Sequence, residues 1–204
     1  MNATLKNYDN AYINSNADMI GYHIEGNSKN VLLFIHGMNA HSGTWRKNIP
    51  YFSKEWMTIA PSLTPTSRIS QSIVTQYIQT ILMMIKPLLS EQISVIGNSL
   101  GGVLASLLLM SELPICSLIL EDIPDLYDLQ PKKLVDYINK KKTPTLLVWG
   151  QKDTITPLSI GEKLNKFIIK SKLIVFEDTG HTPHWERSVE FNKTVYDFLK
   201  ENNC

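Results

Sequence analysis

The stretch that decides the fold is "QISVIGNSLGG", residues 92–102, in which one serine stands between glycines. The apolar, β-branched run before the first glycine predicts a buried strand. Apolar side chains then recur at spacings of three and four from Leu100 to Leu108, which predicts a helix that starts at Ser99. The glycines beside the serine suit a sharp turn, because backbone approaches backbone there. Ser99 is therefore either a nucleophile on this turn or a small residue that only allows the turn.

The same alternation of short apolar runs and longer helical patterns extends along the rest of the chain. Strands alternating with helices predict an α/β fold, with a mostly parallel central sheet and helices on both faces. Ligands of such sheets bind at the carboxyl ends of the strands. Besides 92–97, we expect strands at 31–37, 57–63, 115–122, 143–150 and 172–178, and helices at 44–56, 70–89, 100–108, 157–168 and at the C-terminal end.

Length and composition are those of one ordinary globular domain, residues 1–204. The net charge of +1 gives no field that would attract nucleic acid or an anionic membrane. No apolar run approaches the ~20 residues of a membrane-spanning helix, and the N-terminal residues show no signal peptide pattern. Cys116 and Cys204 form no disulfide framework, and Cys116 fits the core, so a reducing cytoplasmic location is the simpler interpretation.

Three polar residues, Ser99, Asp153 and His181, each follow a predicted strand. An imidazole with a pKa near 6.5 can accept a serine proton at neutral pH, and a carboxylate can orient that imidazole. Taken singly, Ser99 fits a structural turn, Asp153 fits a loop near a helix start, and His184 competes with His181 as the base. The chain order serine, aspartate, histidine on strand ends favours one catalytic triad.

The predicted strand at 31–37 ends with a His-Gly pair, which opens a loop that faces the same edge of the sheet as Ser99. The backbone N–H of Met38 could pair with that of Leu100 as an oxyanion hole. His36 is expected to support this loop through hydrogen bonds. The Thr-Pro pair between His181 and His184 does not match the helical spacing of a zinc motif. We therefore expect no metal and no cofactor.

At these motifs the chain resembles the α/β-hydrolase superfamily, from about residue 20 to the C-terminus. The resemblance implies Ser99 as the nucleophile, His181 as base and then acid, Asp153 as its orienting partner, and the N–H groups of Met38 and Leu100 as the oxyanion hole. A serine at the turn argues against dehalogenase or epoxide-hydrolase chemistry, which uses an aspartate there. The motifs that carry the resemblance follow family strands three, five, seven and eight: His36-Gly37, Gly97-Asn-Ser-Leu-Gly101, Gly150-Gln-Lys-Asp153 and Gly180-His181.

Two segments depart from the family pattern. Residues 60–70, "APSLTPTSRIS", lack the aspartate and glycines of the D-x-R-G-x-G-x-S stretch that often follows the fourth strand. Many relatives insert a helical cap between strands six and seven, but only residues 122–143 are available here. They predict a minimal lid, with Leu134, Val135 and Ile138 on its inner face. Five lysines of this segment could contact an acidic carrier or a phosphate, or form a solvated helix face: Lys132, Lys133, Lys140, Lys141 and Lys142.

These observations predict a serine hydrolase that cleaves a carboxylic ester or thioester through an acyl-enzyme intermediate. The open site suits a small-molecule or carrier-bound acyl substrate, and an oligomer could close it. An acyltransferase or a lyase would use the same residues. A ligand-binding receptor or inactive scaffold on the same fold is the alternative from another class, because a fold does not fix a reaction.

Overall fold

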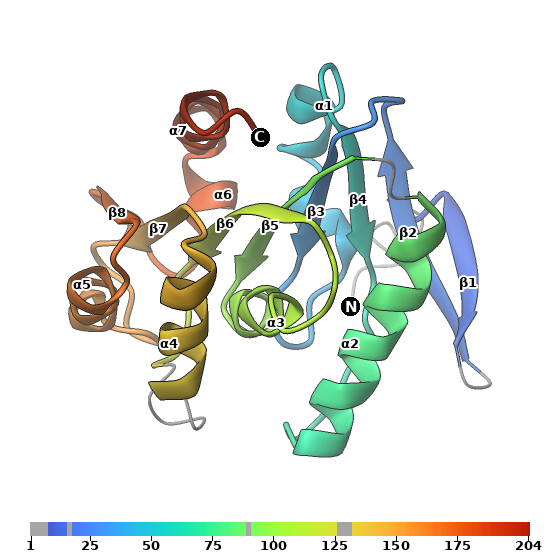
Figure 1. The fold of residues 1–204 in the computed structure, drawn as a ribbon, viewed down its shortest axis with the longest axis horizontal. Helices are drawn as coiled ribbons and strands as arrows, with labels where there is room; N and C mark the ends of the chain where they lie inside the picture. The colour runs from blue at the N-terminus through green and yellow to red at the C-terminus, as the bar shows by residue number, and fades with distance from the viewer. Residues whose placement is uncertain (1–7, 16–17, 89–90, 126–131) are drawn as a thin grey trace.

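The computed structural model describes residues 8–15, 18–88, 91–125 and 132–204 (Figure 1). Its centre is an eight-stranded sheet with the order β1-β2-β4-β3-β5-β6-β7-β8. Every neighbouring pair from β4 to β8 in this order is parallel, which confirms the predicted mostly parallel sheet. The strands are β1 (Ala11–Ser15), β2 (Asp18–Glu25), β3 (Val31–Ile35), β4 (Met57–Pro61), β5 (Ile93–Asn98), β6 (Ile115–Glu121), β7 (Thr145–Gly150) and β8 (Ser171–Phe176).

Helices cover both faces of the sheet, as the sequence predicts (Figure 1). Four of them, α2 to α5, enclose one apolar core, and α1, α6 and α7 enclose the aromatic core on the other face. The elements are 3-10 turns η2 (Ser42–Trp45) and η3 (Lys86–Leu88), and helices α1 (Ile49–Phe52), α2 (Gln71–Ile85), α3 (Leu100–Leu108), α4 (Lys132–Lys141), α5 (Leu158–Phe167), α6 (Pro183–Glu186) and α7 (Ser188–Glu201). Within the described ranges, no helix is long and apolar enough to cross a membrane.

The N-terminal hairpin was not anticipated from the sequence. Strands β1 and β2 pair antiparallel, and β2 pairs antiparallel with β4 at the edge of the parallel sheet. Helix boundaries also differ slightly. The expected helix at 44–56 is divided into η2 and the short α1, which has Pro50 in its first turn, where the missing proline N–H breaks no helical bond. Helix α5 begins at Leu158, one residue later than expected, with the non-helical Pro157 at its N-cap position.

The expectation of two unpaired cysteines was wrong. Cys116, in β6, and Cys204 form a disulfide across a sequence separation of 88 residues. Their Cα atoms are 5.8 Å apart, which is an ordinary distance for such a bond. The N–H of Cys204 donates to Leu199 and its carbonyl accepts from Trp56, so the end of the chain is held against the aromatic core. The sequence could not show this pairing because it depends on where α7 returns to the sheet.

Helix α4 lies beside α3 and α5, on one face of the sheet (Figure 1). Leu134, Val135 and Ile138 are buried in the core, as their spacing predicts. Lys140 to Lys142 are exposed just before β7 begins, at the edge of the sheet opposite to the carboxyl ends of the strands. This position favours the interpretation of a solvated helix face. Residues 126–131 of the expected lid lie outside the described residues, so the lid at 122–143 stays a prediction.

Candidate active site

The turn between β5 and α3 has the geometry expected of a nucleophile elbow. Ser99 has φ 52° and ψ −121°, a conformation that side chains rarely adopt. A Cβ on Gly97 would lie 2.3 Å from the carbonyl oxygen of Gly101. A Cβ on Gly101 would lie 2.1 Å from the carbonyl oxygen of Ile35. Both glycines are therefore required by the close backbone approach that holds Ser99 in its strained conformation.

Two backbone N–H groups flank Ser99. Leu100 is the first residue of α3, so its N–H has no carbonyl partner within the helix. The loop after β3 passes directly beside the elbow, since a Cβ on Gly37 would lie 3.4 Å from the Cβ of Ser99. In the described part of the chain, the N–H groups of Met38 and Leu100 donate to no protein acceptor. Both remain available to a ligand at the serine.

Asp153 and His181 meet as the sequence predicts. Nδ1 of His181 lies 2.7 Å from Oδ2 of Asp153, whose side chain is buried. The second carboxylate oxygen of Asp153 accepts from the N–H groups of Ile155 and Thr156, and the hydroxyl of Thr156 donates to Oδ2 at 2.6 Å. Burial alone would raise the pKa of Asp153, but the hydrogen bonds from His181, Thr156 and Ile155 together lower it. Asp153 is therefore held as a carboxylate that fixes the ring of His181.

The backbone around His181 is held by two neighbouring strands. Asn98, the residue before the serine, donates through Nδ2 to the carbonyl oxygen of His181 at 3.0 Å. Glu121, at the end of β6, accepts from the N–H of His184 and from its Nδ1, each at 2.7 Å. Both side chains of this pair are buried. His184 therefore serves to anchor α6 and does not compete with His181 for Asp153.

The serine and the histidine are brought to the same sheet edge without a direct bond. Within the described ranges, no hydrogen bond joins Oγ of Ser99 to His181. Catalytic hydrogen bonds are often long in proteins without substrate and shorten when substrate binds. The structure thus unites Asp153 and His181 directly and links Ser99 to them through its neighbour Asn98.

Asp122 is a site residue that the sequence reasoning missed. It follows β6 directly, has φ 47° and is fully buried. One carboxyl oxygen accepts from the N–H of Gly150, whereas Oδ2 has no partner that donates to it. Burial, then the charge of Glu121, raises the pKa of Asp122 to about 10. The pair Glu121-Asp122 at a predicted strand end was the available signal.

Asp122, Asp153 and His181 each offer one ligand atom within 4.8 Å of the others, which makes this cluster a candidate cation site. The donor set does not fit one well. A protonated carboxyl group is a poor ligand, and Asp122 retains its proton at neutral pH. A carboxyl oxygen of Asp122 lies within 4.8 Å of one of Asp153, and the pKa of Asp122 is raised by burial and the charge of Glu121, to which the charge of Asp153 adds.

His36 supports the loop beside Ser99. Its Nδ1 lies 2.7 Å from the carbonyl oxygen of Gly37, and its Nε2 accepts from the N–H of Leu63 at 2.9 Å. Burial lowers the pKa of His36 to about 4, so the ring is neutral, with the proton on Nδ1. The residue thus joins the β3 loop to the segment after β4, and its hydrogen bonds match the supporting role expected from the sequence.

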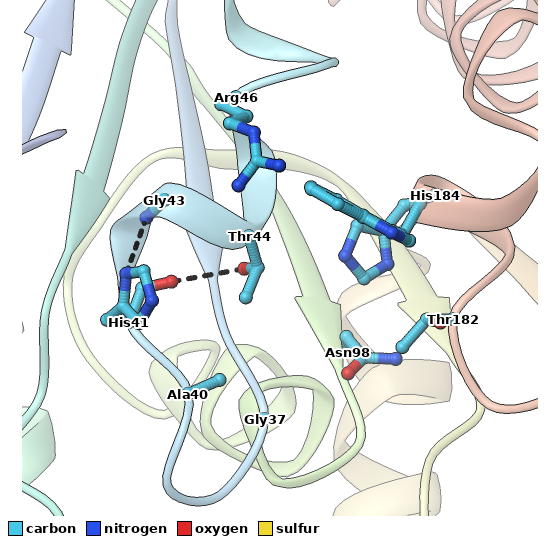
Figure 2. A pocket seen from close by; sticks show the side chains of 10 residues that line it. Gly37, Ala40, His41, Gly43, Thr44, Arg46, Asn98, Thr182 and His184 are labelled. Carbon is cyan, nitrogen blue, oxygen red and sulfur yellow. Dashed lines mark hydrogen bonds between the residues drawn. The ribbon is translucent and has the colours of Figure 1, made fainter. Parts of the chain in front are cut away.

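A cavity of about 690 Å³ adjoins the elbow (Figure 2). It lies between the loop after β3 with η2 on one side, and the segment around α6 on the other. Ser99 and His181 are not among its lining residues, but their chain neighbours are, because Asn98 precedes the serine and Thr182 follows the histidine. The lining residues are Gly37, Ala40, His41, Gly43, Thr44, Arg46, Asn98, Thr182, His184 and Trp185.

Solved structures share the whole arrangement of strands and helices. A meta-cleavage product hydrolase from Pseudomonas fluorescens superposes with a TM-score of 0.79 at 20% identity, over 95% of this chain and 98% of that chain. A thermophilic esterase from Thermogutta terrifontis also gives a TM-score of 0.79, at 16% identity, over 95% and 99%. The chain therefore has the α/β-hydrolase fold. Identities this low establish the fold alone.

Matches to known sequences cover parts of the chain. The family described as alpha/beta hydrolase fold matches residues 119–188, which include Asp153 and His181 but not Ser99. A 2-hydroxy-6-oxononadienedioate/2-hydroxy-6-oxononatrienedioate hydrolase from Cupriavidus pinatubonensis is 35% identical over 72 residues, 34% of this chain and 25% of the relative. A hydrolase of the same name from Escherichia coli is 35% identical over 83 residues, 39% and 29%. The chain thus spans about a quarter of the length of these relatives.

Proposed function

We propose that the protein is a serine hydrolase that cleaves a carboxylic ester or thioester through an acyl-enzyme intermediate. The observation that carries the proposal is the hydrogen-bonded pair of Asp153 and His181 at the same sheet edge as the strained Ser99. The superfamily and its hydrolase members support it. The chemistry needs only protein groups, so no cofactor or metal is part of the proposal. The substrate is a small-molecule or carrier-bound acyl compound, and the proposed location is the cytoplasm.

Each proposed role follows from a contact of the site. His181 takes the proton from Oγ of Ser99 through Nε2 as the oxygen attacks the carbonyl carbon. The negative charge that develops on the carbonyl oxygen is stabilised by the N–H groups of Met38 and Leu100, and one such donor contributes roughly 10²–10³ in rate. Asp153 stabilises the imidazolium that forms on His181, which then protonates the leaving group. Water then attacks the acyl carbon and gives a proton to His181, and His181 returns that proton to Oγ of Ser99 as the acid leaves.

A fluorophosphonate probe tests the nucleophile directly. We expect the wild-type protein to be labelled at Ser99 and a Ser99→Ala variant to remain unlabelled. Ser72→Ala is the matched control, because Ser72 is exposed on α2, away from the elbow, and its loss should leave labelling unchanged. A folded wild-type protein that fails to react, or a Ser99→Ala variant that reacts equally well, would refute the proposal and favour a ligand-binding protein.

Chromogenic esters and matching acyl-thioesters of increasing chain length would then separate the substrate classes. The relatives named for 2-hydroxy-6-oxononadienedioate hydrolysis suggest a second candidate substrate, supported by 35% identity over 72 and 83 residues. We expect turnover of at least one ester or thioester, lost in Ser99→Ala. Turnover of the oxo-dienedioate alone would favour the second candidate.

A further inference from the structure

The cavity beside the elbow is bounded by two segments that each carry part of the proposed machinery. The loop after β3 leads from Gly37 and Met38 to η2, and α6 follows His181 after one residue. Asn98 forms part of the wall between them and contacts the backbone of His181. A group attached to an acyl chain at Ser99 therefore has this space of about 690 Å³ immediately next to it.

The walls of this cavity carry one uncompensated cation. None of its ten lining residues is an aspartate or a glutamate. His184 is already paired with the buried Glu121. Arg46 forms no salt bridge and donates no side-chain hydrogen bond in the part of the chain that the structure describes. In Figure 2 its guanidinium points toward the space between Thr44 and His184. The cavity is therefore positively charged.

Arg46 is positioned by an aromatic ring without losing its donors. Its guanidinium lies 4.2 Å from the centroid of Trp185. A guanidinium stacked on an aromatic face keeps its N–H groups free at the edge, in a fork that matches an oxyanion. Lys47 contacts the same ring at 4.3 Å, but its Nζ donates to the carbonyl oxygen of Trp185 at 2.9 Å and Lys47 does not line the cavity. Arg46 alone presents a free cation to the interior.

A second donor faces the same space. Nδ1 of His41 accepts from the N–H of Gly43 at 3.1 Å, so a neutral His41 carries its proton on Nε2. Burial, and the charge of Arg46, lower the pKa of His41, although Asp9 opposes the shift. The ring is thus a neutral donor at pH 7. The hydroxyl of Thr44 donates to the carbonyl oxygen of His41 and fixes the loop.

We propose that this cavity binds an oxyanion carried by the substrate, with Arg46 as the specificity-determining residue and His41 as a second donor. The favoured substrate is then an ester or thioester of a dicarboxylic acid, whose free carboxylate contacts Arg46 while its acyl carbon lies at Ser99. A charged hydrogen bond of this kind contributes about 1.5–3 kcal/mol, which corresponds to roughly 10- to 150-fold in kcat/KM. This inference rests on the proposed function for its kinetic test.

The test compares pairs of p-nitrophenyl esters that differ only in a terminal carboxylate, such as the glutarate half-ester against the pentanoate ester. We expect wild type to prefer the acidic ester, and Arg46→Met to lower its kcat/KM at least tenfold, mainly through KM. The neutral ester should change less than twofold. Arg46→Lys should retain part of the preference, because it keeps the charge but not the fork. Lys54→Met is the control, because Lys54 is an exposed cation two residues after α1 and does not line the cavity. This variant should leave kcat/KM unchanged for both esters.

Equilibrium binding separates this inference from the proposed hydrolysis. Glutarate and inorganic phosphate are titrated into wild type, Arg46→Met and Lys54→Met by calorimetry. Glutarate binding that is lost only in Arg46→Met supports the oxyanion site even if no ester is hydrolysed, and phosphate binding with the same dependence would identify a phosphate-bearing substrate instead. Equal kinetic losses for acidic and neutral esters, or glutarate binding unaffected by Arg46→Met, would overturn it. A misfolded Arg46→Met leaves the decision to Arg46→Lys, which must then show a weaker acidic preference than wild type.

Discussion

Removal of the disulfide should lower the free energy of unfolding more than any of the single substitutions below. Cys116 and Cys204 close a loop across 88 residues of sequence separation. The chain-entropy relation for a loop of this length gives about 4.6 kcal/mol of stabilisation at 25 °C, through the unfolded state. The packing of Cys204 should survive in a serine variant, because its backbone bonds to Leu199 and Trp56 do not depend on sulfur.

The assay is urea unfolding of wild type and of the double variant Cys116→Ser/Cys204→Ser, followed by tryptophan fluorescence. With a slope of about 2 kcal/mol per molar urea, the midpoint should fall by about 2 M. Reduced wild type should unfold like the variant, and thiol titration should find two thiols only after reduction. Equal midpoints for oxidised wild type and the variant would refute the reasoning. Thiol counts on protein taken directly from cells also test the cytoplasmic proposal, since a reducing compartment favours free thiols.

Three further predictions concern the site. Asp122→Asn should make the free energy of unfolding less dependent on pH. The pKa of Asp122 is raised from 3.8 to about 10, so the contribution of this group to stability is full below pH 3.8 and is lost as pH rises toward 10. Urea midpoints measured across this range should therefore fall less steeply in the variant than in wild type. Glu121→Gln should lower the free energy of unfolding by about 1–3 kcal/mol and also slow turnover, because the amide can accept from only one of the two buried His184 groups, its N–H and its Nδ1; an unchanged midpoint would contradict this. Gly101→Ala should destabilise the protein by about 1–3 kcal/mol and abolish probe labelling, since its Cβ would meet the carbonyl oxygen of Ile35; normal labelling would show that the elbow tolerates the shift.

The parallel part of the sheet could be predicted from the sequence because its strands are buried on both faces. β3, β5 and β7 are mostly apolar runs in which every residue is buried, and each ends at a motif residue or just before one. The hairpin of β1 and β2 was missed because it lies at the sheet edge, and polar residues interrupt the apolar pattern of its sequence. Edge strands are defined by their partner, and no local spacing reports that partner.

The sequence predicts those site residues that each follow a single strand. It does not predict those whose role depends on the register between two strands. Ser99, Asp153 and His181 each follow their own strand, so their order was enough. Asp122 acquires its role only because β6 pairs with β7 and places its carboxyl group at the N–H of Gly150. Thr156 precedes the expected helix at 157–168, and its hydroxyl donates to Asp153, which no spacing in the sequence indicates. Neither role follows from spacing in the sequence, because each depends on which segments lie side by side in the fold.

The disulfide also divides the proposed machinery into two covalent parts. Asp153 and His181 lie inside the ring that Cys116 and Cys204 close, whereas Ser99 and the loop after β3 lie outside it. A protease that cuts one exposed peptide bond between residues 117 and 203 would therefore open the ring without separating the fragments. Nicked protein would run as one species until a reductant was added, and the histidine would stay tethered to the sheet that carries the serine. Cleavage of a loop in this part of the chain therefore does not release the histidine from the serine as long as the disulfide is intact.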